Sequence, residues 1–310
     1  MRGVRWRKLG RIFCVDGDRT WNKSHAQVPT AMLMNERIRI YYSTRDAANR
    51  TSTSFFDVST ADPTRVLWVH NAPLLKPGAH GSFDDCGAMA SAVVREGAET
   101  LLYYVGWNVR NTVPFHNSIG VAISRDDALT FSRSFAGPIL DRCRVDPYFC
   151  TTAHVRRTGT WQMWYSSGTE WRQSGSRLEP LYHIKYATSE NGIDWDREGS
   201  IAIDFNADEE GGLVRPTVMY FEGGYRMWYS RRSWHDYRGG NSSYRIGYAE
   251  SADGLRWQRR DEAACIDVSD MGWDSEMIEY PCVVRCDGKL YLFYNGNGFG
   301  STGIGVAIGE

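Results

Sequence analysis

The pattern of hydrophobic and polar positions repeats along the whole chain. A short apolar run ending in two aromatic residues occurs five times, for example in Met163-Trp-Tyr-Ser and Met227-Trp-Tyr-Ser. Runs of this length, bounded by turn residues, are typical of buried β-strands. The second aromatic residue recurs every 61 to 65 positions, at Tyr42, Tyr104, Tyr165, Tyr229 and Tyr294. The chain therefore contains five related units.

Two further phrases accompany the aromatic pair. One follows it in most units, as in Ile246-Gly-Tyr-Ala-Glu-Ser-Ala-Asp-Gly-Leu-Arg-Trp, and predicts a strand, a tight Asp-Gly turn and another strand. The other lies 13 residues before the tyrosine, as in Pro216-Thr-Val-Met, and predicts a further strand. Each unit is therefore expected to form four antiparallel strands.

The predicted fold is all-β, a five-bladed β-propeller with four antiparallel strands per blade, formed as a single domain by residues 1–310. The chain stops at Ile304-Gly-Val-Ala-Ile-Gly-Glu, which corresponds to a third strand. It begins with Gly3-Val-Arg-Trp-Arg-Lys, which matches the fourth-strand phrase Gly254-Leu-Arg-Trp-Gln-Arg. We expect residues 3–9 to complete blade five and close the ring. An open β-sandwich would explain neither the period nor the matched ends.

The composition excludes some classes of function but does not identify one. The 36 basic and 37 acidic residues leave a net charge of −1, so nucleic acid is not an expected partner. No apolar run approaches the roughly 18 residues that span a bilayer, and the basic N-terminus lacks the apolar stretch of a secretory signal. We expect no membrane association and a cytoplasmic location. The seven cysteines form no Cys-x-x-Cys pair, so we predict no disulfide framework, no metal and no cofactor.

Together these phrases resemble the five-bladed propeller superfamily of arabinanases and β-xylosidases, invertases and levansucrases, and β-mannoside phosphorylases. The resemblance covers essentially the whole chain, through the pattern Pro-x-Val, Met-Trp-Tyr-Ser and Ile-Gly-Tyr-Ala-x-Ser-x-Asp-Gly-x-x-Trp. It implies a sugar bound at one end of the central axis, with acidic residues there performing the chemistry. The Ser-x-Asp-Gly phrase is also similar to the Asp box of six-bladed sialidases. Because five units disagree with six blades, we interpret it as a turn lock.

The acidic residues can be compared after aligning the first strands on the position of Pro281. Asp84 and Asp274 share one register, and an acid that recurs around a pseudo-symmetric ring is expected to anchor a loop. Glu279 is the only acid two residues before the proline position. The resemblance implies that Glu279 is the general acid, because related hydrolases carry theirs in a Glu-Gly-Pro phrase. The alternative is a structural Glu279 paired with Arg215.

A second catalytic carboxylate is less clearly marked. The related hydrolases carry an Asp that acts as the catalytic base directly before the first-blade proline, and Val28 occupies this position here. His25 and Gln27, which precede it, suit hydrogen bonding to a ligand rather than activation of water. Asp85 and Asp146 are the candidate catalytic partners of Glu279. Asp146-Pro is similar to the Asp-Pro phrase of the invertase group, in a register shifted outward.

The loops after the aromatic pairs should open on the same face as the sugar. Aromatic rings stack on sugars and arginine forks bind carboxylate or phosphate, so these loops predict an anionic ligand. The candidate substrate-binding residues, with His25 and Gln27, are Arg45, Trp107, Trp171, Arg172, Glu210, Arg215, Arg231, Trp234 and His235.

Three functions remain open from the sequence. The first is a carbohydrate-active enzyme working at an anomeric carbon of a small, anionic sugar or nucleotide-sugar. The second is a noncatalytic sugar-binding propeller, favoured by Val28 in place of the expected Asp. The third is a biosynthetic sugar-modifying or glycosyl-transferring enzyme on the same scaffold. In each case the expected partner is a small-molecule sugar or nucleotide-sugar.

Overall fold

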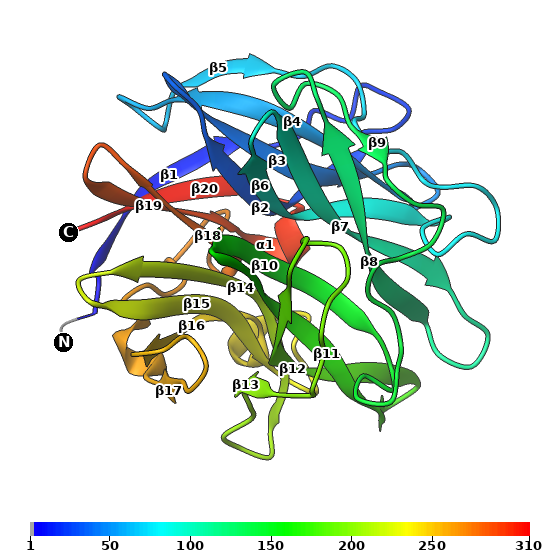
Figure 1. Ribbon diagram of the computed structural model, residues 1–310. Helices are drawn as coiled ribbons and strands as arrows, with labels where there is room; N and C mark the ends of the chain where they lie inside the picture. Colours follow the sequence, from blue (N-terminus) through cyan, green and yellow to red (C-terminus); the bar gives the residue numbers. More distant parts are fainter. Residues whose placement is uncertain (1–2) are drawn as a thin grey trace.

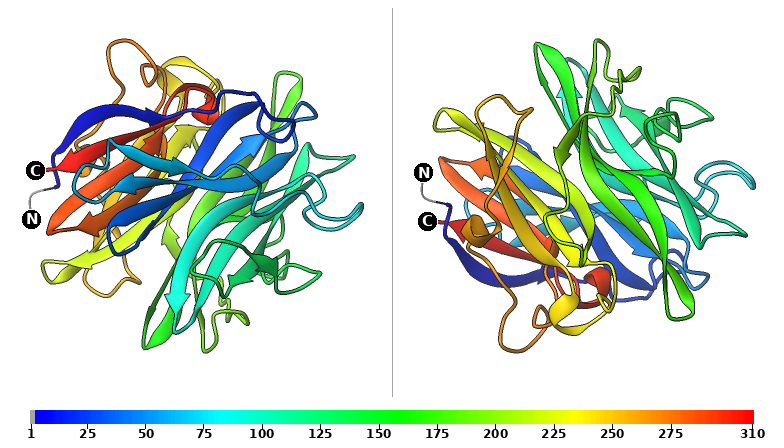
Figure 2. Two further views of the ribbon diagram at one scale, coloured as in Figure 1. Left: turned by 90° about the horizontal axis from the view of Figure 1, so that it is seen from above. Right: turned by 90° about the horizontal axis from the view of Figure 1, so that it is seen from below.

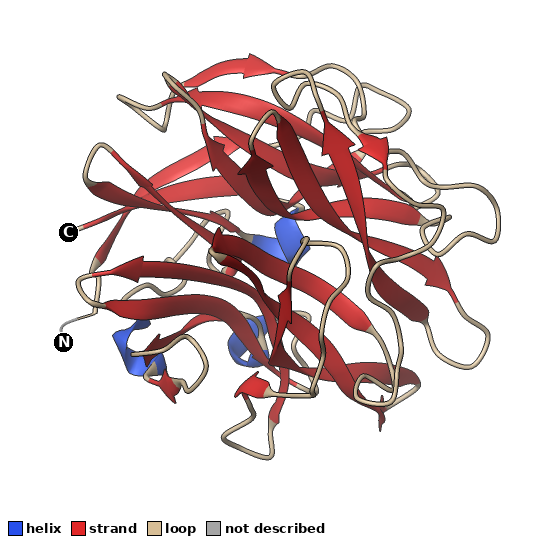
Figure 3. Ribbon diagram, viewed as in Figure 1, coloured by secondary structure: helices blue, strands red, loops and turns tan. Residues whose placement is uncertain are grey.

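The computed structural model describes residues 3–310, and almost all of its regular structure is β-strand (Figure 3). The sheets are mostly antiparallel, so the predicted all-β class is confirmed. The helical segments within these residues are short: α1 (Asn297–Gly300) and two 3-10 turns, η1 (Gly240–Ser242) and η2 (Asp261–Ala264). None of them is long and apolar enough to cross a membrane.

The strands of residues 3–310 form antiparallel groups that follow the sequence units. Group one contains β2 (Ser24–Leu33), β3 (Arg37–Arg45), β4 (Thr51–Ser59) and β5 (Val66–Val69). Group two contains β6 (Gly87–Glu96), β7 (Glu99–Val109), β8 (Phe115–Ser124) and β9 (Ser132–Arg133). Group three contains β10 (Cys150–Thr158), β11 (Thr160–Ser174), β12 (Arg177–Ser189) and β13 (Ile201–Ile203). Group four contains β14 (Glu210–Phe221), β15 (Gly224–Ser233), β16 (Arg245–Ser251) and β17 (Gln258–Arg259). Group five contains β18 (Glu279–Cys286), β19 (Lys289–Asn295), β20 (Ile304–Gly309) and β1 (Trp6–Phe13).

Hydrogen bonding joins these groups into one four-stranded and two eight-stranded sheets. Each eight-stranded sheet consists of two groups linked by a single parallel residue pair, Thr51 with Gly87 or Tyr182 with Gly212. The first link requires glycine, because a Cβ atom on Gly87 would lie 1.8 Å from Thr51 Oγ1. Each eight-stranded sheet is therefore continuous only through this one residue pair, and its two groups are otherwise separate.

The first strands of the groups surround the middle of the molecule (Figure 1). β2 contacts β6, β6 contacts β10, β10 contacts β14 and β14 contacts β18. β18 in turn contacts β2. The five groups are therefore arranged in a closed ring.

Each interface between neighbouring groups has its own apolar cluster. Between groups one and two, Tyr41 and Phe55 pack with Leu102 and Tyr104. Corresponding clusters lie between groups two and three, three and four, four and five, and five and one. The tyrosines that mark the sequence repeat are at most 1% exposed. Because both faces of every group are covered, the core is distributed around the ring.

The N-terminal strand closes this ring. β1 pairs antiparallel with β20, from Trp6 opposite Gly309 to Phe13 opposite Ile304, and the two strands lie side by side (Figure 2). The strand runs over Trp6–Phe13 rather than the predicted residues 3–9, because its pairing continues through two register shifts. Trp6 lies 7% exposed, with its ring edge-on to Trp228 of group four at 5.8 Å.

Replacing Trp6 with Ala should lower the free energy of unfolding by about 3–5 kcal/mol, the usual cost of emptying a buried aromatic site. The same substitution at Trp68, which is 45% exposed on the outer strand β5, is the matched control and should cost much less. Chemical denaturation of both variants measures the difference. Equal losses of unfolding free energy in the two variants would show that the packing of β1 does not stabilise the ring.

Candidate active site

All five first strands are bulged at the same place. The ladder shifts register between Gln27 and Thr30 in β2 and between Glu279 and Cys282 in β18, and β6, β10 and β14 shift at the matching position. In three strands the residue before the proline has a positive φ: Val28 (53°), Arg215 (57°) and Tyr280 (54°). This conformation is unfavourable for such residues, above all for β-branched Val. The strain is concentrated at one level of the ring.

Side chains of other strands hold these strained residues. The Val28 amide donates to Asn295 Oδ1 at 2.8 Å, the Arg215 amide to Thr152 Oγ1 at 2.9 Å and the Tyr280 amide to Ser230 Oγ at 2.7 Å. Local strain of this kind persists only when its surroundings enforce it, and it is common at functional sites. The bulges therefore indicate that a functional site lies at this level of the ring.

Glu279 lies at one of these bulges and is completely buried. Neither of its carboxyl oxygens has a hydrogen-bond partner. Burial raises the pKa of Glu279 well above its ordinary value, although the charges of Arg45 and Arg232 oppose this shift. This shift favours the protonated form of the carboxyl group, which is the form that a general acid requires.

Arg215 does not pair with Glu279, so the structural alternative for this acid is not found. The Arg215 guanidinium crosses to β2, where it donates to the carbonyl of Pro29 at 2.8 Å and to Thr30 Oγ1 at 3.1 Å. It is 1% exposed. Arg215 therefore ties two strands together inside the ring, and its contact with substrate stays a prediction.

Three of the predicted binding residues gather on the group-one side of Glu279. Arg45 Nε donates to Gln27 Oε1 at 3.0 Å, and Gln27 Nε2 donates to the carbonyl of Phe299 in α1 at 2.7 Å. Burial lowers the pKa of Arg45, while the charges of Tyr280 and Glu279 raise it. Burial and the charge of Arg45 lower the pKa of His25 to about 4. The site therefore presents a neutral imidazole beside a cation.

An aromatic cluster that the sequence did not predict lies on the other side. Arg232 Nε donates to the hydroxyls of Tyr182 and Tyr244, at 3.2 and 3.1 Å, and its guanidinium lies 3.7 Å from the ring centre of Tyr237. The ring of Tyr244 lies 6.0 Å from that of Tyr280, the residue after Glu279. Phe299 packs against Tyr237 and Tyr244, so α1 touches both sides of the site.

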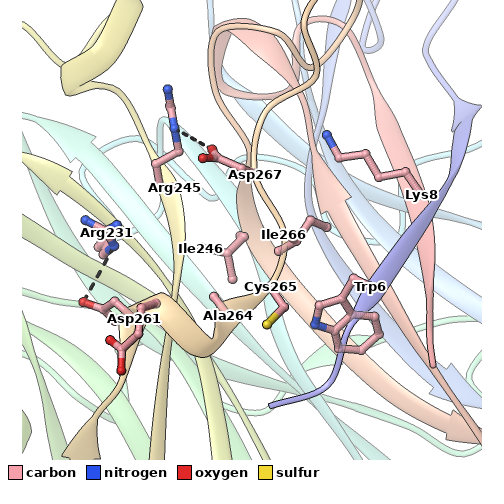
Figure 4. A pocket seen from close by; sticks show the side chains of 11 residues that line it. Trp6, Lys8, Arg231, Arg245, Ile246, Asp261, Ala264, Cys265, Ile266 and Asp267 are labelled. Carbon is pink, nitrogen blue, oxygen red and sulfur yellow. Dashed lines mark ion pairs between the residues drawn. The ribbon is translucent and has the colours of Figure 1, made fainter. Parts of the chain in front are cut away.

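Arg231, predicted to bind substrate, faces elsewhere because successive side chains of β15 point to opposite faces. Its Nε lies 3.7 Å from Asp261, and it lines a cavity of about 620 Å³ between β1, β15 and β16 (Figure 4). In the same cavity Arg245 pairs with Asp267 at 3.0 Å. This cavity does not include Glu279, and its arginines already face carboxylates.

Several acids belong to a structural unit that we call the tyrosine clasp, in which the repeat tyrosine donates to an aspartate that also meets a cation. Tyr165 donates to Asp146 Oδ2 at 3.0 Å, and Lys185 and Arg197 contact the same carboxylate at 3.2 and 2.9 Å. Burial raises the pKa of Asp146, but hydrogen bonding from Ser167 and the charge of Lys185 lower it overall. Asp146 is saturated with structural partners.

The clasp recurs around the ring. Tyr104 meets Asp84 and Arg133, and Tyr294 meets Asp274 and Lys8. The predicted anchoring role of Asp84 and Asp274 is thereby confirmed. In group four, Tyr229 meets Asp261 and Arg259.

Glu210 is engaged in the same region, because Arg259 contacts both of its oxygens at 2.7 and 2.8 Å. Glu210 thus belongs to the framework and is not presented to a ligand. Asp85 accepts from the Gly81 amide at 2.9 Å, and its other oxygen is buried without a partner. Among residues 3–310, no hydrogen bond or ion pair joins Asp85 or Asp146 to Glu279. No group of three or more His, Cys, Asp or Glu side chains within this range is arranged to hold a metal.

The remaining predicted substrate-binding residues, which we call the rim residues, lie in two places. They are Trp107, Trp171, Arg172, Trp234 and His235. Trp107 donates from its indole to Thr51 Oγ1 at 2.8 Å, at the junction of groups one and two. Trp171 packs on the cluster that contains Tyr182 and Tyr244. Arg172 and His235 flank Trp234, the guanidinium at 5.0 Å and the imidazole at 4.8 Å from its ring. Four of the five rim residues therefore gather at the ends of β11 and β15.

Comparison with known proteins places the chain in a family. The uncharacterized proteins MT1551 and Rv1502 of Mycobacterium tuberculosis, from strains CDC 1551 / Oshkosh and ATCC 25618 / H37Rv, are each 39% identical to it over 307 residues, covering 98% of this chain and 99% of theirs. The chain belongs to the same family as these two proteins. No protein-family model matches it.

Several solved structures that superpose on this chain are glycoside hydrolases. A glycosyl hydrolase from Bacteroides ovatus superposes with a TM-score of 0.73 at 17% identity, over 99% of this chain and 93% of that one. A thermostable family-43 glycoside hydrolase gives 0.65 at 18%, over 94% and 90%. A structure from the GH130 family of mannoside phosphorylases, some of which hydrolyse β-1,2 mannosidic linkages in Candida mannan, gives 0.71 at 16%, over 99% and 93%. The predicted resemblance to the propeller glycoside hydrolases is confirmed for the fold.

Replacing Asp146 with Ala should cost about 3–5 kcal/mol of stability, because it leaves the buried Lys185 and the partly buried Arg197 without their carboxylate. The exposed Asp18 is the control, and its replacement should leave stability nearly unchanged. The native carboxylate has a pKa below its unfolded value, so its contribution is complete above the unfolded pKa and disappears as the pH falls through the folded one. Urea denaturation at pH 7 and at acidic pH measures both effects. A variant as stable as the wild type at pH 7 would contradict the clasp.

Proposed function

We propose that the five strand groups are the blades of a five-bladed β-propeller and that the protein is a carbohydrate-active enzyme of glycosidase type. The closed ring of first strands, the five inter-group clusters and the β1–β20 pairing support the blade count. The enzyme acts at the anomeric centre of a small sugar, and Glu279 delivers the proton to the leaving oxygen.

The observation that carries this proposal is the state of Glu279. A buried carboxyl group without hydrogen bonds costs free energy, and native proteins rarely keep one that serves no purpose. Its raised pKa favours the protonated form, which is the form that can donate a proton. A structural Glu would be expected to have a partner, as Glu210 has in Arg259. Glu279 is therefore best explained as a group whose hydrogen-bond partner is the substrate.

An anionic sugar or nucleotide-sugar is the proposed substrate class, and Arg45 is the residue that would bind its charge. Arg45 donates to the amide oxygens of Gln27 and Asn49, and among residues 3–310 it contacts no carboxylate. Arg172 and Arg231 already face acids, and Arg232 is buried among tyrosines. A guanidinium without an acid, next to a neutral His25, is suited to a carboxylate or phosphate of a ligand.

The missing second carboxylate shapes the reaction. Two-carboxylate hydrolysis needs a base that activates water, whereas Val28 replaces the expected Asp and Asp146 is held in its clasp. Asp85 keeps one unpartnered oxygen and stays the candidate base for hydrolysis. Attack by an anionic acceptor such as phosphate would need no base. The same lack of a base favours, as a second candidate function, a sugar-binding protein that has no catalytic activity.

Access to Glu279 requires the turn around α1 to move. Glu279 is fully buried in this structure, and Phe299 contacts Gln27 on one side of the site and Tyr244 on the other. Phe299 has a φ of 58° between two glycines, Gly298 and Gly300, that also have positive φ. Such a turn can change shape at low cost, because glycine tolerates many conformations. We propose that the sugar enters by displacing it.

The test of the proposed function is Glu279→Gln, which keeps the shape of the side chain and removes the acid. Turnover should fall by about 10²–10⁴-fold, while melting temperature and ligand binding stay near those of the wild type. A panel of 4-nitrophenyl glycosides, sugar phosphates with and without inorganic phosphate, and nucleotide-sugars provides the assays. Glu276→Gln, at an exposed position three residues earlier, is the control. A Glu279→Gln protein that unfolds, or that turns over normally, would refute the catalytic role.

Arg45→Gln tests the charge of the ligand. Binding of a sugar phosphate or uronic acid should weaken by about 10-fold or more, because a charge-assisted hydrogen bond contributes about 1.5–3 kcal/mol. Binding of the matching neutral sugar should change little. Calorimetry with each pair of sugars measures the difference, and Arg50→Gln, at an exposed arginine nearby, is the control. Equal weakening for charged and neutral sugars would contradict an anion-binding role.

A further inference from the structure

The tyrosine pair, Tyr182 and Tyr244, has an unusual hydrogen-bond arrangement. Their hydroxyl oxygens lie 2.5 Å apart, and Arg232 donates to both of them. The remaining groups of Arg232 donate to the carbonyls of Ser233 and Pro180. All three side chains are at most 8% exposed. Arg232 therefore has its acceptors, and it holds the two phenols in one fixed orientation.

Counting protons shows that one of them has no acceptor. The two phenols carry two hydroxyl protons, and Arg232 can only donate. One proton lies between the two oxygens. Among residues 3–310, neither hydroxyl has any other acceptor within hydrogen-bond distance. A buried donor without an acceptor is costly, so the second proton requires an acceptor from outside the protein.

Tyr244 lies beside the segment of β18 that carries Glu279. The carbonyl of Tyr244 accepts from the amide of Ile278, the residue directly before Glu279, at 3.2 Å. The ring of Tyr244 also lies 6.0 Å from that of Tyr280, directly after it. Burial raises the pKa of Tyr244, and the nearby charge of Glu279 raises it further. Of the two phenols, Tyr244 is therefore the one placed to meet a molecule bound at Glu279.

We propose that Tyr244 donates a hydrogen bond to a substrate oxygen beside the bond that Glu279 protonates. Tyr182 donates to Tyr244, and the cation of Arg232 polarises both phenols, so the outward donor is stronger than an isolated tyrosine. The pair thereby selects a sugar with a hydroxyl, carboxylate or phosphate oxygen at this position. An analogue without that oxygen leaves the donor unpaired, and sites of this kind reject such analogues strongly. This inference rests on the proposed function for the identity of the ligand.

Tyr244→Phe tests the proposal, because it removes the donor and leaves Arg232 its contacts with Tyr182. The affinity for the sugar that binds the wild type best in the panel should fall about 10- to 100-fold. The melting temperature should stay within a few degrees of the wild-type value. Tyr237→Phe is the matched control in the same cluster, since its hydroxyl already donates to Glu179 Oε2 at 2.5 Å. That variant should lose stability and keep its affinity.

Measuring affinity in the Glu279→Gln background separates this inference from the catalytic role. If Glu279→Gln turns over normally and Tyr244→Phe still weakens binding, the proposed function fails and the donor role stands. If Tyr244→Phe binds the sugar like the wild type, the donor role is overturned whatever Glu279 does. A Tyr244→Phe protein that loses stability without losing affinity has the same consequence, because the hydroxyl would then serve the fold alone.

Discussion

Everything in this structure depends on covering both faces of every strand group. A four-stranded sheet has two surfaces, and here each packs through an apolar cluster on the next group around the ring. The tyrosines at the repeat positions belong to this packing through their rings. In four groups their hydroxyls also bind the aspartates of the clasps. One residue per repeat thus connects the apolar core to the polar framework.

The candidate site is built where this regular packing is interrupted. At the bulges the first strands lose register, and three residues take a positive φ, which is stabilised by the hydrogen bond that each amide donates to a side chain of another strand. The interruption turns Arg215 inward to Pro29 and leaves Glu279 buried without a partner. Both side chains are enclosed by the ring, since each is at most 1% exposed.

Much of the fold was predictable from the sequence, because strand length and turn residues are local properties. Glu279 was predictable for a related reason: it is the acid that breaks the repeat. The partners of Asp146 were not, since Lys185 and Arg197 lie on later segments of its group and nothing local marks them. The different surroundings of Arg231 and Arg232 were not predictable, because the direction of each side chain depends on strand register. Tyr182 and Tyr244 were not predicted because they are 62 residues apart in the sequence, and only the fold brings their hydroxyls into contact.

Arg215 has a consequence for how the protein comes apart. In open repeat arrays each unit touches only its neighbours, so end units can unfold by themselves. Arg215 of group four reaches the carbonyl of Pro29 in group one, and group five lies between these two groups in the ring. This hydrogen bond therefore connects two groups that are not neighbours in the ring. Unfolding of group five from either chain end would leave the buried guanidinium of Arg215 without its surroundings, so partial unfolding costs free energy. The whole ring is therefore expected to melt as one cooperative unit.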